Sequence, residues 1–141
     1  MKNKKTIIIA EAGVNHNGKT RFIKKLIKKA AEAKVDYIKF QAFKADQLVK
    51  RDTKKAEYQK LNTDPGETQY EMLKKLEISE KNFIKLKQYC TKKNIEFLSS
   101  IFDEDSLFFL INILKIKKIK IPSGEITNGP LLFRIAQSGC K

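Results

Sequence analysis

The chain has 141 residues, of which 41% are hydrophobic and 33% charged, and its formal net charge is +14. This length and apolar content suffice for one globular domain with a core, and they exclude a disordered chain. Cys90 and Cys140 lie far apart without a CxxC spacing, which argues against a disulfide framework or a zinc knuckle. The apolar run at 6–10 is too short for a signal-peptide core or a membrane span, so we expect a cytoplasmic protein with no membrane partner.

The positive charge raises the question of nucleic acid, because clustered Lys and Arg neutralise phosphates. Only Arg21, Arg51 and Arg134 are arginines, and the lysines are spread along the whole chain. Surfaces that read bases or grip phosphates favour clustered Arg. We expect no nucleic-acid partner and keep a basic nucleic-acid-binding domain as a remote alternative. We keep two explanations for the positive charge: lysines on solvated helix faces, and attraction of anionic ligands.

Strand and helix patterns alternate along the chain. Short β-branched or aromatic runs predict strands at 6–10, 35–41, 95–100 and 116–121. Helical spacing predicts helices at 19–34, 64–76, 80–94, 103–114 and 131–138. The expected N-caps are Asp64, Ser79 and Asp103, with Pro65 and Pro130 in first turns. Strand and helix, repeated four times with a long insert after the second strand, predict an α/β fold with a parallel sheet.

Polar side chains occur at or near the carboxyl ends of three of these strands. They are Glu11 after the first strand, Lys39 and Gln41 in the second, and Lys120 in the fourth. A sheet interior does not accept unpaired ammonium groups, so both lysines need an anionic partner, and α/β proteins bind ligands at this edge. Each residue alone also fits a strand-end charge that reaches solvent. Together they favour a site for a phosphate or carboxylate ligand.

The loops add three further polar groups. Ser123, Gly124 and Glu125 follow the fourth strand and supply a hydroxyl for a phosphate oxygen and a carboxylate that could act as a general base. The tripeptide alone is weak evidence. His16, the single histidine, lies in the loop after the first strand without a second ligand at metal spacing, so we expect a hydrogen-bonded loop residue. We predict no metal ligands in this chain.

Three sequence blocks resemble the sialic acid synthase family, in particular the N-acetylneuraminate and N,N'-diacetyllegionaminate synthases. The blocks are I-I-I-A-E-A-G-V-N-H-N-G at 7–18, I-K-F-Q-A-F at 38–43 and K-I-P-S-G-E-I-T-N at 120–128. The resemblance implies a partial TIM (β/α)8 barrel in which residues 1–141 form the first four βα units. The C-terminal half-barrel and a small antifreeze-like domain would then be absent. A departure is Ser100-Ile101-Phe102, where many relatives have Thr-Pro-Phe.

The family condenses phosphoenolpyruvate with an N-acetylmannosamine-type sugar, an N-acetylated hexosamine, to give a nonulosonic acid and phosphate. By resemblance, Lys39 and Lys120 bind phosphoenolpyruvate, with Ser123 at its phosphate. Gln41 and Glu11 resemble sugar-binding groups, and Glu11 and Glu125 are the candidate catalytic carboxylates. The family also uses a divalent metal, Mn or Mg, whose ligands would lie outside this chain.

Two further expectations follow from the incomplete barrel. A barrel of this type needs eight strands, so we predict that the chain alone is catalytically inactive. Open sheet edges invite pairing with a homo-oligomeric partner or with a missing C-terminal half. The alternative function is therefore a non-catalytic half-barrel that acts as a binding or assembly module.

Overall fold

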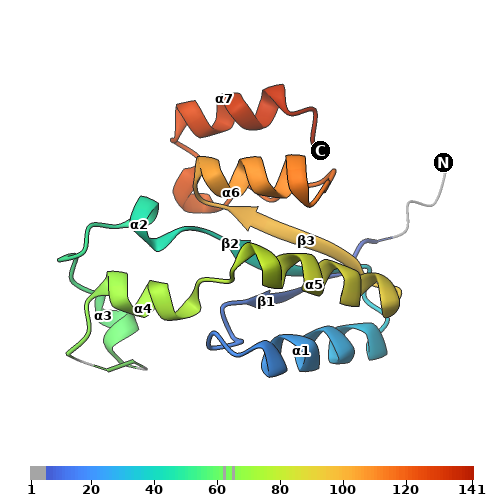
Figure 1. Cartoon of the computed structure of the whole chain (residues 1–141), viewed down its shortest axis with the longest axis horizontal. Helices are drawn as coiled ribbons and strands as arrows, with labels where there is room; N and C mark the ends of the chain where they lie inside the picture. Colours follow the sequence, from blue (N-terminus) through green and yellow to red (C-terminus); the bar gives the residue numbers. More distant parts are fainter. Residues whose placement is uncertain (1–5, 62, 65) are drawn as a thin grey trace.

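The computed structural model describes residues 6–61, 63–64 and 66–141 as an α/β fold built on an open parallel sheet (Figure 1). The described residues form three strands, β1 (Ile9–Gly13), β2 (Tyr37–Ala42) and β3 (Glu96–Ile101), in the order β1-β2-β3. Both strand pairs are parallel. The predicted α/β class and parallel sheet are confirmed.

Helices connect the strands and continue beyond them. Helix α1 (Thr20–Glu32) joins β1 to β2, and α5 (Glu80–Lys92) precedes β3. After β3 come α6 (Glu104–Phe108), the π-helix η1 (Phe109–Ile113), the 3-10 turn η2 (Ser123–Glu125) and α7 (Gly129–Gln137). The insert between β2 and α5 contains α2 (Ala45–Leu48), α3 (Glu57–Lys60) and α4 (Gln69–Leu76). Figure 1 shows α1, α5, α6 and α7 following one another across the molecule in chain order.

The core lies between one face of the sheet and these helices. On β2 the buried residues Ile38, Phe40 and Ala42 alternate with the half-buried Tyr37, Lys39 and Gln41, as period-two alternation requires. The apolar face packs against buried residues of α1, α5, α6, η1 and α7. The predicted assignment of the apolar face of this strand to the helices is confirmed. The opposite face of β2 carries the polar side chains.

The first strand begins later than predicted. The run at 6–10 was expected to be a buried strand followed by a loop from Glu11, but β1 spans Ile9–Gly13 and the side chains of Ile7, Ile8 and Ile9 are exposed. Pairing with β2 starts at Ile9 opposite Tyr37 and reaches Gly13. The prediction was wrong because β-branched composition indicates a strand but not which residues the neighbouring strand pairs with.

The fourth strand is reduced to a short extended segment. Residues 116–121 were expected to form a regular strand, but among the described residues only a parallel bridge between Ser100 and Lys120 joins this segment to β3. Pro122, which follows, has no N–H to continue the pairing. On its other side the segment pairs with Lys141, whose N–H donates to the Lys117 carbonyl while its carbonyl accepts from the Ile119 N–H, both at 2.9 Å. These two bonds have the pattern of a parallel pair.

The insert is ordered by a buried lysine. Nζ of Lys55 donates to Thr63 Oγ1 at 2.8 Å and lies 3.4 Å from a Glu67 carboxylate oxygen. The helix expected from Asp64 instead begins after Thr68, whose hydroxyl accepts from the Glu71 N–H at 3.2 Å. Glu67, three residues after the expected cap Asp64, forms no capping box because its carboxylate pairs with Lys55 and Lys75. Pro65, the expected first-turn proline, lies outside the described residues.

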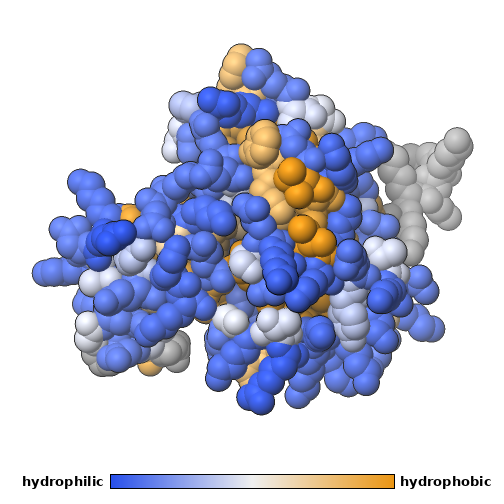
Figure 2. Space-filling model, in the orientation of Figure 1, coloured by the Kyte–Doolittle hydropathy of each residue, from blue (hydrophilic) through white to orange (hydrophobic). Residues whose placement is uncertain are grey.

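The remaining helices follow their predicted caps with one change of type. Ser79 caps α5 and Asp103 caps α6, as expected. The single helix predicted at 103–114 turns into a π-helix after Phe108. No helix in the described part of the chain is long and apolar enough to cross a membrane. Figure 2 shows a mostly hydrophilic face with apolar side chains gathered over α5 and the α6–η1 helix; Ile84 of α5 and Ile113 of η1 are both exposed.

Candidate functional site

The polar face of the sheet brings Glu11 and Lys39 together. They are opposite each other in the parallel register of β1 and β2, and Lys39 Nζ lies 2.5 Å from Glu11 Oε2. The Lys39 side chain is 15% exposed and that of Glu11 is 50% exposed. The ammonium group is therefore largely withdrawn from water, while its carboxylate partner remains accessible. Such a lysine keeps hydrogen-bonding capacity for a second anion, because it has three donors.

A second row of residues crosses the same face one step further along the strands. Gln41 is opposite Ser100, and Ser100 is bridged to Lys120. Partners in a parallel register point to the same side of a sheet, so the three side chains share the face that carries Lys39. The structure thus gathers four of the predicted residues, Glu11, Lys39, Gln41 and Lys120, on one face near the carboxyl ends of the strands.

Gly13 allows the first row to form. The register of β1 shifts between Glu11 and Gly13, and the Gly13 backbone has a φ of +51°, in the left-handed region. A Cβ at this position would lie 3.2 Å from Glu11 Oε1 and 3.8 Å from Gln41 Nε2. The absence of a side chain therefore leaves room for the carboxylate and the amide beside each other.

Ser123 and Glu125 lie in η2, directly after the extended segment that contains Lys120. Ser123 is exposed and Glu125 is half-buried. A carboxylate oxygen of Glu125 accepts from Asn128 Nδ2 at 2.8 Å, and Asn128 Oδ1 caps α7 by accepting from the Leu131 N–H at 3.2 Å. Among the described residues no hydrogen bond or ion pair joins η2 to Glu11 or Lys39. The loop is placed at the same end of the sheet because all strands are parallel.

His16 is a hydrogen-bonded loop residue, as expected. Its side chain is buried, and its Nδ1 accepts from the Gly18 N–H at 3.0 Å. Burial lowers the pKa of His16 below its usual 6.5, because a charged imidazolium would lose its hydration. The ring is therefore neutral at pH 7, with its proton on Nε2. It shapes the turn between β1 and α1.

Sequence reasoning missed two residues that help to build this edge. Ser100, which lies between Gln41 and Lys120, was noted only as a departure from relatives, although period two along 95–100 would have placed it on the polar side. Asp103 was expected only as a cap. Its Oδ2 also accepts from the Lys44 N–H at 2.8 Å, which ties the segment after β2 to the segment after β3. No local sequence pattern predicts this hydrogen bond, because its two residues lie far apart in the chain.

The described residues include no group of three or more His, Cys, Asp or Glu side chains that could hold a metal ion. The donor set gathered on the polar face, a glutamate already paired with a lysine beside an amide and a serine, does not fit a divalent ion.

Comparison with known proteins relates most of the chain to one protein family. A model of the NeuB family matches residues 26–141. The chain is 54% identical over 129 residues to the N,N'-diacetyllegionaminic acid synthase of Legionella pneumophila, covering 92% of this chain and 36% of that protein. It is 50% identical over 134 residues to the synthase of the same name from Campylobacter jejuni, covering 95% of this chain and 40% of that protein.

Solved structures agree with these relatives. The N-acetylneuraminic acid (sialic acid) synthetase of Leptospira borgpetersenii superposes with a TM-score of 0.81 at 33% identity, over 98% of this chain and 43% of that one. The spore coat polysaccharide biosynthesis protein SpsE of Bacillus subtilis gives a TM-score of 0.70 at 34% identity, over 96% of this chain and 34% of that one. The chain thus spans well under half the length of these relatives. Both comparisons lead to the same assignment: the chain belongs to the NeuB family.

Proposed function

We propose that this chain is the phosphoenolpyruvate-binding half of a sialic-type acid synthase. Two rows of side chains on the polar face of the sheet support this function. Lys39 is paired with Glu11 in the first row, and Lys120 lies in the second row with Gln41 and Ser100. Two lysines at the carboxyl edge of a parallel sheet suit an anion with both a carboxylate and a phosphate. The relatives that match nearly the whole chain are named as synthases of sialic-type acids.

In the proposed reaction, C3 of phosphoenolpyruvate forms a bond to the aldehyde carbon of an N-acetylated hexosamine, and the aldehyde oxygen takes up a proton to become a hydroxyl. Water adds to C2, and C2 then becomes a ketone as its bond to the phosphate oxygen breaks and phosphate leaves. Lys39 and Lys120 hold the anionic substrate, and the Ser123 hydroxyl donates to its phosphate. Glu125 accepts the proton of the attacking water, while Glu11 and Gln41 bind and orient sugar hydroxyls. The divalent Mn or Mg that family resemblance implies remains a prediction for another part of the protein.

The same proposal includes the N-terminal half of a (β/α)8 barrel. Its support is the repeated strand–helix order with all helices of the core on one face of the sheet. The pairing of Lys141 with 117–119 supports a further parallel strand beside the fourth segment. A closed barrel would also enclose the polar face that carries Lys39 and Lys120. Cytoplasmic location stays a prediction.

Titration of the 141-residue chain with phosphoenolpyruvate, followed by calorimetry, tests the binding step. We expect Lys39→Ala and Lys120→Ala each to weaken binding by at least about tenfold, the typical loss on removing a charged hydrogen bond. Lys24→Ala is the matched control, because Lys24 is an exposed lysine on α1 away from the polar face. Equal affinity in all four proteins would refute the assignment of the lysines.

A second assay tests the incomplete-barrel part of the proposal. The isolated chain, mixed with phosphoenolpyruvate, N-acetylmannosamine and Mn, should release no phosphate above the uncatalysed rate. Co-expression with the segment of the Legionella synthase that this chain does not match should restore release. Phosphate release by the isolated chain would show that no further half is needed.

A further inference from the structure

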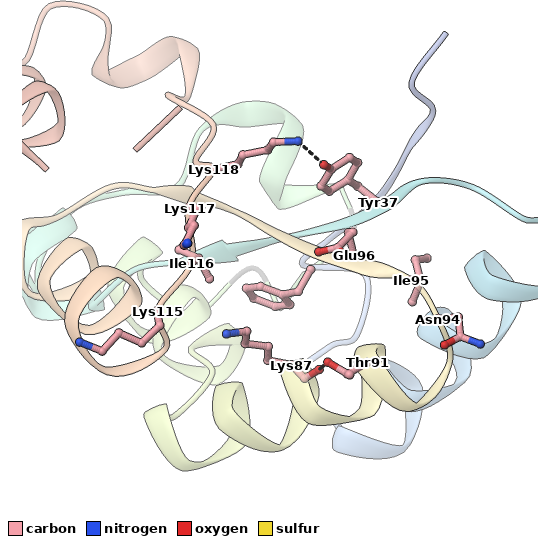
Figure 3. Close-up of a pocket in the computed structure, with 11 residues that line it drawn as sticks. Tyr37, Lys87, Thr91, Asn94, Ile95, Glu96, Lys115, Ile116, Lys117 and Lys118 are labelled. Atoms are coloured by element: carbon pink, nitrogen blue, oxygen red, sulfur yellow. Dashed lines mark hydrogen bonds between the residues drawn. The ribbon is translucent and has the colours of Figure 1, made fainter. Parts of the chain in front are cut away.

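A hollow of about 710 Å³ opens at the other end of the sheet, where the parallel strands begin (Figure 3). One wall is α5, which contributes Lys87 and Thr91, and the opposite wall is the segment 115–118. Between them lie the start of β3, with the buried side chain of Phe97, and the buried Ile95 that precedes the strand. This volume falls in the range of pockets that hold small molecules.

The hollow exists because the fourth segment separates from β3. Their pairing is limited to the Ser100–Lys120 bridge and the bond from the Lys120 N–H to the Ser99 carbonyl, at 3.0 Å. Residues 117–119 instead pair with Lys141. On the N-terminal side of the bridge the two backbones therefore diverge. Side chains line the space between them, because no backbone hydrogen bonds join the described residues of the two segments there.

The lining of this hollow is strongly cationic. Its titratable side chains include four lysines, Lys87, Lys115, Lys117 and Lys118, against one carboxylate, that of Glu96. None of the four forms an ion pair with an acidic side chain in the described part of the chain. Lys87 donates to the Leu114 carbonyl and Lys118 to the Tyr37 hydroxyl, so both are positioned by neutral acceptors. Figure 3 shows Lys87 and Lys117 on opposite walls of the hollow.

We propose that this hollow binds a small polyphosphate anion, the diphosphate or triphosphate group of a free ion or of a nucleotide, at a site separate from the one described above. Lysines held by neutral acceptors keep their full charge and spare donors for phosphate oxygens. An excess of three positive charges matches a diphosphate better than a monoanion. Thr91 and Asn94 supply further polar groups at the rim.

The location separates this site from the phosphoenolpyruvate proposal. Tyr37 and Glu96 are the first residues of β2 and β3, whereas Gln41 and Ser100 lie near the carboxyl ends of the same strands. A ligand in the hollow therefore does not contact Lys39 or Lys120.

Nitrogen-15 NMR of the 141-residue chain, titrated separately with inorganic diphosphate, ATP and adenosine, tests the proposal. We expect diphosphate and ATP to shift the amide signals of Thr91, Asn94 and Lys117 in a saturable way, and adenosine to leave them unchanged. Tighter binding of ATP than of diphosphate identifies a nucleotide as the ligand, and equal affinity identifies the phosphate group alone. Shifts spread evenly over surface lysines would overturn the proposal.

Variants separate this site from non-specific attraction to a basic protein. The double substitution Lys87→Ala, Lys117→Ala should weaken diphosphate binding at least tenfold. Lys85→Ala, an exposed lysine on the same helix outside the hollow, should change it less than twofold. Equal loss in Lys85→Ala would contradict the site, and retained helix signals in circular dichroism exclude unfolding as the cause.

Discussion

His16 couples the stability of the chain to pH. Burial lowers its pKa in the folded state, so the unfolded chain, with the usual value of 6.5, binds the proton more readily. The stabilisation is complete above pH 6.5 and is lost as pH falls from there through the lower folded pKa. We predict a decrease in the free energy of unfolding between pH 7.5 and pH 5.5, measured by urea denaturation.

His16→Asn is the matched variant for this prediction. Its side-chain oxygen can still accept from the Gly18 N–H, which His16 Nδ1 accepts at 3.0 Å, but it does not titrate. The variant should lose less stability than the wild-type chain over the same pH interval. An identical pH dependence in the two proteins would mean that other groups cause the decrease.

The two cysteines should differ in reactivity. Burial, with a smaller contribution from the Glu96 carboxylate, raises the pKa of the Cys90 thiol to about 12. Cys140 is only partly buried, and its thiol donates to the Ile116 carbonyl at 3.5 Å. Because the thiolate is the reactive form, we predict that iodoacetamide at pH 8 modifies Cys140 well before Cys90. Mass spectrometry of Cys140→Ser should then show almost no modification, and rapid modification of that variant would contradict the buried position of Cys90.

At the residue scale the sequence predicted the identity of the polar groups better than their partners. Glu11, Lys39 and Gln41 could be placed on one face from period two alone. The bond from Asp103 to the Lys44 N–H and the position of Ser100 between Gln41 and Lys120 depend on the register between strands. Register is set by contacts far apart in the chain, which a single sequence does not display.

Helix α4 and the turn before α1 contact each other at Gly18. The Gly18 backbone has a φ of +68°, and a Cβ there would lie 2.2 Å from the Lys75 carbonyl oxygen. Gly18→Ala should therefore combine left-handed strain, about 1 to 2 kcal/mol, with a backbone clash of about 1 to 3 kcal/mol. Gly139→Ala is the matched control, because Gly139 has a φ of +69° but nothing within 4 Å of its Cβ position.

Thermal and urea unfolding of the two variants measure the difference. Gly139→Ala should lose only the stability that corresponds to the left-handed strain. Gly18→Ala should lose this amount and, in addition, the free energy of the clash with the Lys75 carbonyl. Equal losses in the two variants would mean that the loop before α1 moves away from α4 at no cost. The comparison thus tests a tertiary contact between two elements and not only a backbone preference.

At the element scale, predictions succeeded where a cap and an apolar stripe agree. Helices α1 and α5 and strand β3 lie within two residues of their predicted bounds. The helices α2 and α3 of the insert could not be predicted, because each spans only four residues. A helix this short shows no detectable repeat of apolar residues. The prediction of a regular fourth strand at 116–121 was wrong for a different reason. Its composition is that of a strand, but pairing of its start goes to Lys141 and not to β3.

For the whole molecule, the open edge of β1 is the feature that most needs a partner. In the described part of the chain β1 pairs only with β2, and the side chains of Ile7, Ile8 and Ile9 beside this edge are exposed. Unpaired strand edges with apolar side chains template pairing with another chain, and an edge lysine suppresses it. We therefore predict that the isolated chain self-associates as its concentration rises from about 1 μM to 1 mM.

Light scattering coupled to size-exclusion chromatography measures this association and its location. Ile8→Lys should shift the chain toward monomer, because the added charge cannot be buried against a second copy. Tyr58→Lys is the control: this side chain on α3 is 71% exposed, more than the 55% of Ile8, but lies away from the sheet edge. If both substitutions dissociate the oligomer equally, general surface hydrophobicity drives association. If only Ile8→Lys does so, the β1 edge is the surface through which copies of the chain associate.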